Sequence, residues 1–292
     1  MNIIKKIGKI FDVILTVILW GFLLIVLALM IRVVVCDQFP VPSRSMEPTI
    51  IPGDHIVVNK LIFGARIYKN LDFIDGKPLE TFRIKGLRKI QRNDILVFNA
   101  PLSEEWRDIT FDILKVFAKR CIGLPGDTLS IINGFYHNSG TQDTLGYHTA
   151  QLRLSAMAKD SLQPVILRAF PQDSLYNWDI KDFGPLYVPE KGSRININAM
   201  NYLPYQRIIE YETRQRLRVQ DSLLLLENTP LTSYIFQENY YFMGGDHVFD
   251  SQDSRYFGFV PEEFIIGVVQ HILYHRDRNS GAWNWHRFLK SI

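Results

Sequence analysis

A serine at position 45 and a lysine at position 119 could together hydrolyse a peptide bond without a histidine or a metal. A serine hydroxyl becomes a nucleophile when a neighbouring base takes its proton. Lysine can be that base only if burial among apolar groups lowers its pKa well below the solution value of about 10.4. Taken alone, each residue has a simpler interpretation, because most lysines on strands face solvent and most serines have no catalytic role.

The segments around both residues favour this chemistry. The serine lies in a proline-framed stretch, Pro42–Thr49, and proline rings would hold a nucleophile in a fixed position. Lys119 lies in an extended pattern, in which Phe117 and Cys121 would share its face of a strand. Arg120 would point away from that face. The lysine would therefore have apolar neighbours on its own side.

The usual histidine-based arrangements are absent from the sequence. No G-x-S-x-G segment occurs. His247 directly follows Asp246, but adjacent side chains on an extended chain point in opposite directions and make a poor base and orienting carboxylate. His271 and His275 would share a face only on a helix, whereas their segment has a strand pattern. We therefore expect neither histidine catalysis nor a metal site.

Composition argues against other classes of function. The net charge is only +3 and no long basic stripe occurs, so we expect no nucleic-acid binding. The two cysteines, Cys36 and Cys121, form no C-x-x-C pair, which argues against a thiolate zinc site. A disulfide between them stays open, because sequence alone does not decide it.

The N-terminal region carries the signature of a membrane anchor. The run from Val13 to Ile31 contains no charge, and at about 1.5 Å per residue it can cross a hydrocarbon core of roughly 30 Å. Three lysines precede it within residues 1–12, so the positive-inside rule predicts a cytoplasmic N-terminal tail. We predict a transmembrane anchor over residues 13–35, with the remaining chain on the other side of the membrane.

Two alternatives to an anchor are a cleaved signal peptide and a buried core helix. The apolar region of a signal peptide is about 7–15 residues long and is followed by small residues. Here the run is longer and is followed by Arg32-Val33-Val34-Val35. A lipoprotein would have a small residue where this chain has valine before Cys36. The uncleaved anchor fits best.

After the anchor, short apolar and alternating segments predict a mainly β protein. We expect strands at His55–Asn59, Asp94–Phe98, 115–124, Thr128–Ile132, Tyr240–Met243 and 264–274. The stretch from 135 to 238 differs, because it is polar and tyrosine-rich and has helical candidates near 151–160 and 199–217. We therefore predict a catalytic β domain built from residues 36–134 and 239–292, interrupted by an inserted α+β cap subdomain at 135–238.

Four sequence blocks follow the anchor in a fixed order. They are PSRSMEPT at 42–49, GD at 53–54, KRCIGLPGD at 119–127 and GDHVFDSQDSRYFGFVP at 245–261. Together they resemble the bacterial type I signal peptidases, whose blocks read approximately P-S-x-S-M-x-P-T, G-D, K-R-x-x-G-x-P-G-D and G-D-N-x-x-x-S-x-D-S-R. The resemblance implies a coiled antiparallel β-sheet catalytic domain with an inserted cap, behind one transmembrane helix.

The resemblance also implies roles for residues at matching positions. Ser45 would be the acylating nucleophile and Lys119 its general base. The Ser43 hydroxyl would stabilise the oxyanion beside the backbone N–H of Ser45. Ser251 would hydrogen-bond and orient the Lys119 amine.

Other matching positions would support the fold of the site and bind substrate. Asp253 and Arg255 would form a structural ion pair that braces their loop. Shallow apolar pockets that accept small substrate side chains, and so give an Ala-x-Ala preference, would be lined by Phe39, Val41, Ile50 and Ala118. The chain departs from the family pattern at Arg44, where many members have glycine. It departs again at His247-Val248-Phe249, where an Asn-Arg-Asp run is more usual.

The implied function is cleavage of N-terminal signal peptides from exported preproteins, with no cofactor or metal. The implied partners are preprotein signal peptides and the lipid bilayer, with proximity to the secretion machinery, at the outer face of the bacterial cytoplasmic membrane. Three aromatic residues in the tail, Trp283, Trp285 and Phe288, would rest at the membrane interface or belong to the core. Two rival interpretations are a self-cleaving Ser-Lys repressor-type protein and a catalytically inactive membrane-anchored scaffold.

Overall fold

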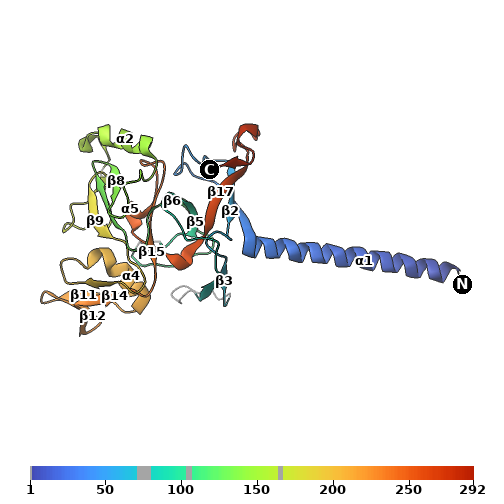
Figure 1. The fold of residues 1–292 in the computed structure, drawn as a ribbon, viewed down its shortest axis with the longest axis horizontal. Coiled ribbons are helices and arrows are strands. Elements are labelled where there is room, and N and C mark those ends of the chain that lie inside the picture. The colour runs from blue at the N-terminus through green and yellow to red at the C-terminus, as the bar shows by residue number, and fades with distance from the viewer. Residues whose placement is uncertain (1, 71–79, 103–106, 164–166) are drawn as a thin grey trace.

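The computed structural model describes residues 2–70, 80–102, 107–163 and 167–292. A long helix, α1 (Asn2–Met30), leaves the body of the molecule and continues into a π-helical turn at Ile31–Val35 (Figure 1). The helical run Ile7–Val35 is long and apolar enough to cross a membrane, and no part of its most apolar window is buried. The alternative of a buried core helix is therefore wrong.

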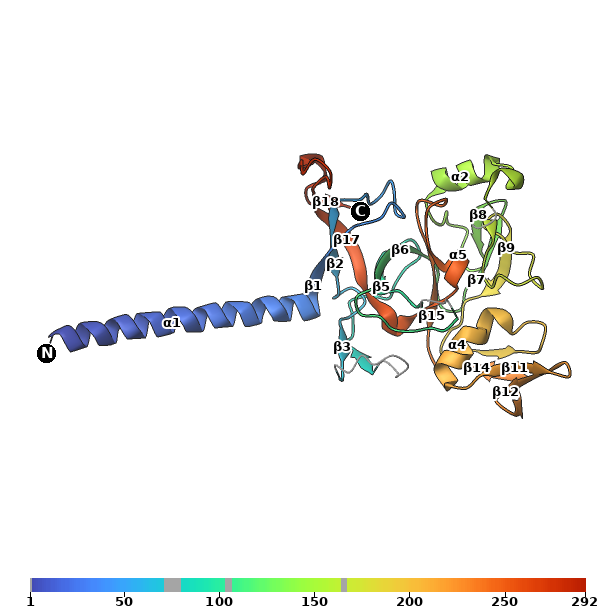
Figure 2. The same ribbon diagram turned by 180° about the vertical axis from the view of Figure 1, so that it is seen from behind.

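The body of the molecule is built on one curled antiparallel sheet (Figures 1 and 2). In spatial order the sheet contains β1 (Cys36–Pro40), β2 (Asp54–Asn59), β17 (Ile265–His275), β5 (Ile95–Asn99), β6 (Val116–Gly123), β15 (Tyr240–Gly244) and β16 (Val260–Pro261). A last strand, β18 (Lys290–Ser291), pairs with β17. The predicted mainly β fold with a coiled antiparallel sheet is confirmed.

Smaller elements surround this sheet. Two-stranded sheets pair β3 (Arg66–Tyr68) with β4 (Thr81–Arg83), and β10 (Arg194–Asn196) with β14 (Ser233–Ile235). Three-stranded sheets contain β7 (Thr128–Ile132), β8 (Phe135–Asn138) and β9 (Phe183–Tyr187), and β11 (Leu217–Gln220), β12 (Leu223–Leu226) and β13 (Thr229–Pro230). The helices of the body are α2 (His148–Ala156), α4 (Leu203–Thr213) and α5 (Ser254–Phe257), with 3₁₀ turns at Lys159–Ser161, Glu262–Phe264 and Trp285–Arg287.

The main sheet separates two hydrophobic cores. Successive side chains on a strand point to opposite faces, so β5 contributes Leu96 and Phe98 to the larger core and Ile95 and Val97 to the smaller one. All five residues of β5 are buried for this reason. Register shifts along β17 bend this long strand. The sheet can thus curl and bring the segment that follows β1 into contact with the middle of β6.

The expected strands are present, whereas the expected helices are displaced or shorter. The turn Asn133-Gly134 has positive φ at both residues and joins β7 to β8, as the hairpin signal predicts. Of the region near 199–217, only Leu203–Thr213 is helical, because Arg214 takes a left-handed conformation that ends the helix. The predicted boundary at 134/135 falls inside the β7–β8 hairpin, and the division into catalytic domain and cap stays a prediction.

Candidate active site

The side chains of Ser45 and Lys119 meet in the interior of the protein, although 74 positions separate them in the chain. The Lys119 Nζ lies 2.5 Å from the Ser45 Oγ. Lys119 is only 4% exposed and Ser45 only 7%. The lysine comes from β6, opposite Leu96 of β5, and the serine from the segment that follows β1. The sheet therefore places a hydroxyl and an amine in direct hydrogen-bond contact away from bulk water.

Burial lowers the pKa of Lys119 to about 8. The buried carboxylate of Asp253 opposes this effect and the guanidinium of Arg255 reinforces it. The Nζ also lies 5.3 Å from the centre of the Phe117 ring, an apolar neighbour that the strand pattern predicts. A lysine with this pKa is partly uncharged near neutral pH, which a proton acceptor for Ser45 requires.

Ser43 lies beside the dyad of Ser45 and Lys119. The Ser43 Oγ is 3.3 Å from the Ser45 Oγ. The backbone N–H of His247 donates to the carbonyl oxygen of Ser45 at 3.1 Å, which ties the loop after β15 to the serine segment. A hydroxyl in this position could donate a hydrogen bond to negative charge that develops on a substrate carbonyl.

Ser251 lies in the same neighbourhood, in the loop that follows β15. A Cβ atom at Gly245 would lie 1.9 Å from the Ser251 Oγ and 2.7 Å from the Ser45 carbonyl oxygen. Glycine is therefore required there, because it lets the Ser251 loop approach the serine segment closely. Ser251 is 7% exposed, and its Oγ has no hydrogen-bond partner among the described residues. Its expected bond to the Lys119 amine stays a prediction.

Asp253 and Arg255 form a bidentate ion pair in the interior. The Arg255 Nε and Nη2 lie 2.9 and 2.7 Å from the two carboxylate oxygens of Asp253, and both side chains are at most 1% exposed. Asp253 also accepts a hydrogen bond from the Gly245 N–H at 2.8 Å. Although burial opposes ionisation, Arg255 holds the pKa of Asp253 below its usual value. The pair fixes both ends of the loop that carries Ser251.

A second ion pair next to the dyad is not part of the sequence prediction. Arg120, which directly follows Lys119, pairs with both oxygens of Asp246 at 2.7 and 2.6 Å. Thr49 also donates to Asp246, at 2.5 Å. All three residues lie inside the sequence blocks that carry the resemblance, but only the fold brings these blocks together. The pair joins β6, the serine segment and the loop after β15.

The chain also braces the serine segment from its C-terminal tail. The carboxylate of Asp54 is fully buried and lies 2.9 Å from the Nδ1 of His275. Arg287 donates to both oxygens of Asp54, at 2.8 and 2.5 Å, and to the carbonyl oxygen of Thr49 at 3.0 Å. The sequence pattern indicates no role for His275 beyond its place in a strand segment. His275 belongs to a network with Asp54 and Arg287 that holds the C-terminal end of the segment containing Ser45.

A groove of about 610 Å³ opens at the dyad. Ser45 and Lys119 lie in its wall together with all four residues predicted to form the substrate pockets, Phe39, Val41, Ile50 and Ala118. Further apolar lining comes from Met46, Ile56, Val97 and Phe117. An apolar groove beside a nucleophile can hold short aliphatic side chains of an extended peptide.

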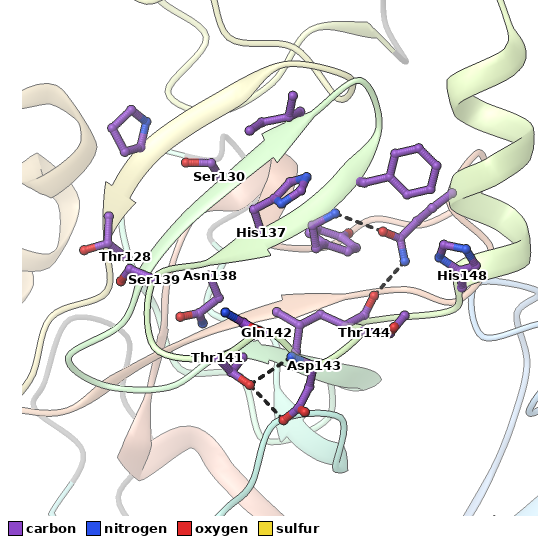
Figure 3. A pocket seen from close by; sticks show the side chains of 16 residues that line it. Thr128, Ser130, His137, Asn138, Ser139, Thr141, Gln142, Asp143, Thr144 and His148 are labelled. Atoms are coloured by element: carbon purple, nitrogen blue, oxygen red, sulfur yellow. Dashed lines mark hydrogen bonds between the residues drawn. The ribbon is translucent and has the colours of Figure 1, made fainter.

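A larger hollow of about 750 Å³ lies over the β7–β8 hairpin and the start of α2 (Figure 3). Its labelled lining consists mainly of hydroxyl and amide side chains, with His137 and His148, and Thr141 hydrogen-bonds Asp143 at its edge (Figure 3). It contains neither Ser45 nor Lys119. It therefore lacks the pairing of nucleophile and base that marks the smaller, apolar groove as the candidate active site.

The thiols and possible metal ligands are also defined by the structure. Cys36 and Cys121 are both free, so the disulfide that the sequence leaves open does not form in this structure. Within the described part of the chain no cluster of three histidine, cysteine, aspartate or glutamate residues could hold a metal ion. Arg44 and His247, where the chain departs from the family pattern, do not interrupt the contact between Lys119 and Ser45. Arg44 pairs with Glu47, and the backbone N–H of His247 donates to the Ser45 carbonyl.

A family model and two curated relatives all identify this chain as similar to signal peptidases. The model of the signal peptidase family, peptidase S26, matches residues 14–168 and 185–274. A signal peptidase I of Buchnera aphidicola subsp. Baizongia pistaciae is 25% identical over 90% of this chain and 77% of its own length. A signal peptidase I of Aquifex aeolicus is 28% identical over 87% of this chain and 81% of its own length.

A crystal structure of a signal peptidase I from Enterococcus faecalis is also similar. It is 24% identical in sequence, and the match covers 62% of this chain and 96% of that chain. The TM-score is 0.29, which is too low to support an argument about the fold.

Proposed function

Because the chain belongs to the signal peptidase family, peptidase S26, as a type I enzyme, we propose that it cleaves signal peptides from exported preproteins with Ser45 as nucleophile and Lys119 as general base. The observation that carries the proposal is the 2.5 Å contact between Lys119 Nζ and Ser45 Oγ in a buried site. The family match disfavours the self-cleaving repressor. The presence of Ser45, Lys119, Ser43 and Ser251 in one neighbourhood disfavours the inactive scaffold.

In the proposed reaction, neutral Lys119 takes the proton of Ser45 as the Oγ attacks the scissile carbonyl carbon. The Ser43 hydroxyl and the Ser45 N–H stabilise the oxyanion. When the tetrahedral intermediate collapses, the C–N bond breaks and the protonated Lys119 gives its proton to the leaving amine. A water molecule, deprotonated by Lys119, then hydrolyses the acyl-enzyme ester and frees the Ser45 hydroxyl.

The groove supports a preference for small residues before the cut. Ile50 and Val41 are buried in its wall, at 0% and 7% exposure, and Ala118 presents only a methyl group. Such a surface leaves room for alanine and no polar partner for longer side chains. We propose that this gives the Ala-x-Ala specificity, with Phe39 completing the lining.

The test of the dyad is cleavage of a preprotein by full-length wild-type protein and by Ser45→Ala and Lys119→Ala. Both variants should lose at least about a thousand-fold in kcat, the scale of nucleophilic and general-base contributions. Matched controls are Ser130→Ala, in the hollow of Figure 3, and Lys191→Ala, an exposed lysine, and both should retain activity. Full activity in Ser45→Ala or Lys119→Ala would show that the dyad is assigned wrongly.

We propose further that α1 anchors the enzyme in the bacterial cytoplasmic membrane, with the N-terminus in the cytoplasm and the groove on the outer face, near the secretion machinery. Support comes from the apolar, unburied surface of the helix and from the lysines that precede the run. Protease added to intact spheroplasts should digest the body and spare the N-terminal tail. Protection of the body would reverse the orientation.

The aromatic tail supports the same placement. Trp283, Trp285 and Phe288 are 50–72% exposed, so the alternative that they belong to the core is wrong. The rings of the two tryptophans stack 5.9 Å apart, and the tail lies on the side of the body from which α1 leaves (Figures 1 and 2). We propose that it rests at the lipid–water interface. Unchanged liposome binding of the body after Trp283→Ala and Trp285→Ala would contradict this.

A further inference from the structure

A second, smaller pocket of about 280 Å³ lies where the anchor meets the sheet. Its wall includes Arg32 of the π-helical turn, Lys60 just after β2, and Arg66 of β3. Arg32 belongs to the last turn of the apolar run Ile7–Val35. Strands β1 and β3 lie beside the root of α1 in both views (Figures 1 and 2). If α1 spans the membrane as proposed above, the pocket would therefore lie at the level at which the anchor leaves the hydrocarbon core.

Among the residues that the structure describes, three cations line this pocket with one carboxylate, that of Asp37. Arg32 and Lys60 share that carboxylate, at 3.0 and 3.4 Å, and Lys60 also donates to the Arg32 carbonyl oxygen at 2.7 Å. Burial lowers the pKa of Lys60, and the charges of Arg66 and Arg32 lower it further while Asp37 opposes them. One carboxylate does not neutralise two cations, so the described lining of the pocket carries an excess of positive charge.

Arg66 adds a cation whose hydrogen-bond partners are all neutral. Its guanidinium donates to the Asn99 side chain at 2.8 Å, to the Tyr68 hydroxyl at 2.6 Å and to the Glu263 backbone carbonyl at 2.7 Å. The Glu263 carboxylate is instead hydrogen-bonded to the Tyr211 hydroxyl. Arg66 is thus held rigidly, and it has no ion pair within the described part of the chain. Burial lowers the pKa of Arg66, and the Glu263 carboxylate, which offsets its charge only from a distance, opposes that effect.

A fourth cation lies directly across the β3–β4 ladder from Arg66. Arg83 is its register partner, and like charges in directly opposed positions destabilise a pair of strands. Within the described residues, the Arg83 guanidinium donates to three backbone carbonyls, those of Gly64, Glu262 and Ile265. Burial, reinforced by Arg66, lowers the pKa of Arg83 to about 10. An anion bound beside Arg66 would relieve this repulsion.

We propose that this pocket binds the phosphate group of an anionic phospholipid headgroup. The proposal rests on the membrane anchorage proposed above, because that anchorage brings headgroup phosphates to the level of Arg32. Guanidinium groups donate paired hydrogen bonds to phosphate oxygens, and basic residues next to a membrane segment attract anionic lipids. The acyl chains would lie along the exposed apolar surface of α1.

The bound headgroup would adjoin the substrate groove. Phe39, Ile113 and Val116 line both the pocket and the groove of the dyad. The lipid would therefore complete the membrane end of the groove, next to the place where a signal peptide must leave the bilayer. Anionic lipid then becomes a structural component of the substrate-binding surface rather than only its surroundings.

The test uses the full chain purified in micelles that contain equal amounts of phosphatidylglycerol and phosphatidylcholine. Native mass spectrometry counts the lipids that remain bound. Wild-type protein should retain phosphatidylglycerol in excess. Lys60→Gln and Arg32→Gln should each reduce that excess by about five-fold, the effect of one cation near a membrane surface.

The matched control is the double variant Lys85→Gln and Lys89→Gln, which removes exposed charge of the same sign outside the pocket. It should leave the excess unchanged, and an equal loss in control and pocket variants would overturn the proposal. Displacement of the lipid by millimolar inorganic phosphate would overturn the lipid assignment in favour of free phosphate. Displacement by a synthetic signal peptide, abolished by Lys60→Gln, would assign the pocket to substrate instead.

Flotation with vesicles after an alkaline wash separates this proposal from the anchorage on which it rests. Protein that floats but shows no preference for phosphatidylglycerol contradicts the headgroup site alone. Protein that fails to float contradicts the anchor, and with it the placement of the pocket at the membrane surface.

Discussion

Replacing Lys119 by methionine should make the protein more stable while it abolishes activity. Burial lowers the pKa of Lys119 from 10.5 to about 8. The folded protein therefore binds this proton less tightly than the unfolded chain, and protonation favours unfolding. At about 1.4 kcal/mol per pKa unit, keeping the charged lysine buried costs roughly 3 kcal/mol at every pH below about 8. Loss of the hydrogen bond to Ser45 offsets about 1 kcal/mol of the gain.

The net expectation is that Lys119→Met raises the free energy of unfolding by about 2 kcal/mol at pH 7. Urea unfolding of the full chain in neutral micelles, followed by tryptophan fluorescence, measures this difference. The advantage should shrink as the pH rises from about 8 towards 10.5, because the wild-type lysine then folds uncharged at no cost. The variant should show no preprotein cleavage at any pH.

A second buried lysine provides the control. Lys181 is 6% exposed, and its amine donates to the backbone carbonyls of Ser155 and Met157 at 3.0 and 2.5 Å. Lys181→Met leaves both carbonyls without their donor and should destabilise the protein by about 1–3 kcal/mol. If Lys119→Met destabilises the protein as Lys181→Met does, or if its effect is independent of pH, the reasoning that burial of charged Lys119 destabilises the fold is refuted.

Three further predictions concern activity. The kcat/KM for a preprotein should rise about ten-fold between pH 7 and pH 9, as Lys119 loses its proton through a pKa of about 8, and a flat profile would contradict its role as base. Ala118→Leu should narrow the groove and lower kcat/KM by about ten-fold or more for a substrate with alanine before the cut, and by less for a substrate with glycine there. Equal losses for the two substrates would argue that Ala118 does not line the substrate pocket. Arg287→Gln should lower kcat more than it raises KM, because Arg287 hydrogen-bonds Asp54 and the Thr49 carbonyl and so positions the segment that carries Ser45. An unchanged kcat in a folded variant would show that these hydrogen bonds are not needed for activity.

The sequence predicted the strands well because their signals are local. The apolar runs of β5 and β17 and the Asn133-Gly134 turn each specify their own conformation, and the structure has all three. Strand β1 was not predicted, because Cys36–Pro40 has no alternating pattern and is extended only through its pairing with β2. The helix α4 ends where Arg214 turns left-handed, which no local residue preference marks.

The candidate site was predicted unevenly for a similar reason. Ser45 and Lys119 belong to recognisable blocks, so the blocks indicated them before any geometry was known. The contacts that hold the two residues together join positions far apart in the chain, such as Arg120 with Asp246 and Arg287 with Asp54. Such pairs follow only from the curl of the sheet. The cationic pocket is a case of the same kind, since its three cations come from separate segments.

With α1 embedded in a membrane as proposed, the junction between helix and sheet would set a fixed height for the reaction. Helical structure persists to Val35 and strand β1 begins at Cys36, with no linker between them. The Lys60 N–H also donates to the Val35 carbonyl at 2.8 Å, which fastens the joint to the end of β2. In a membrane, the nucleophile would therefore stand at a constant elevation above the bilayer rather than sampling a range of elevations on a tether. The enzyme would measure, on each preprotein, the length of chain between the end of the signal helix and the bond to be cut.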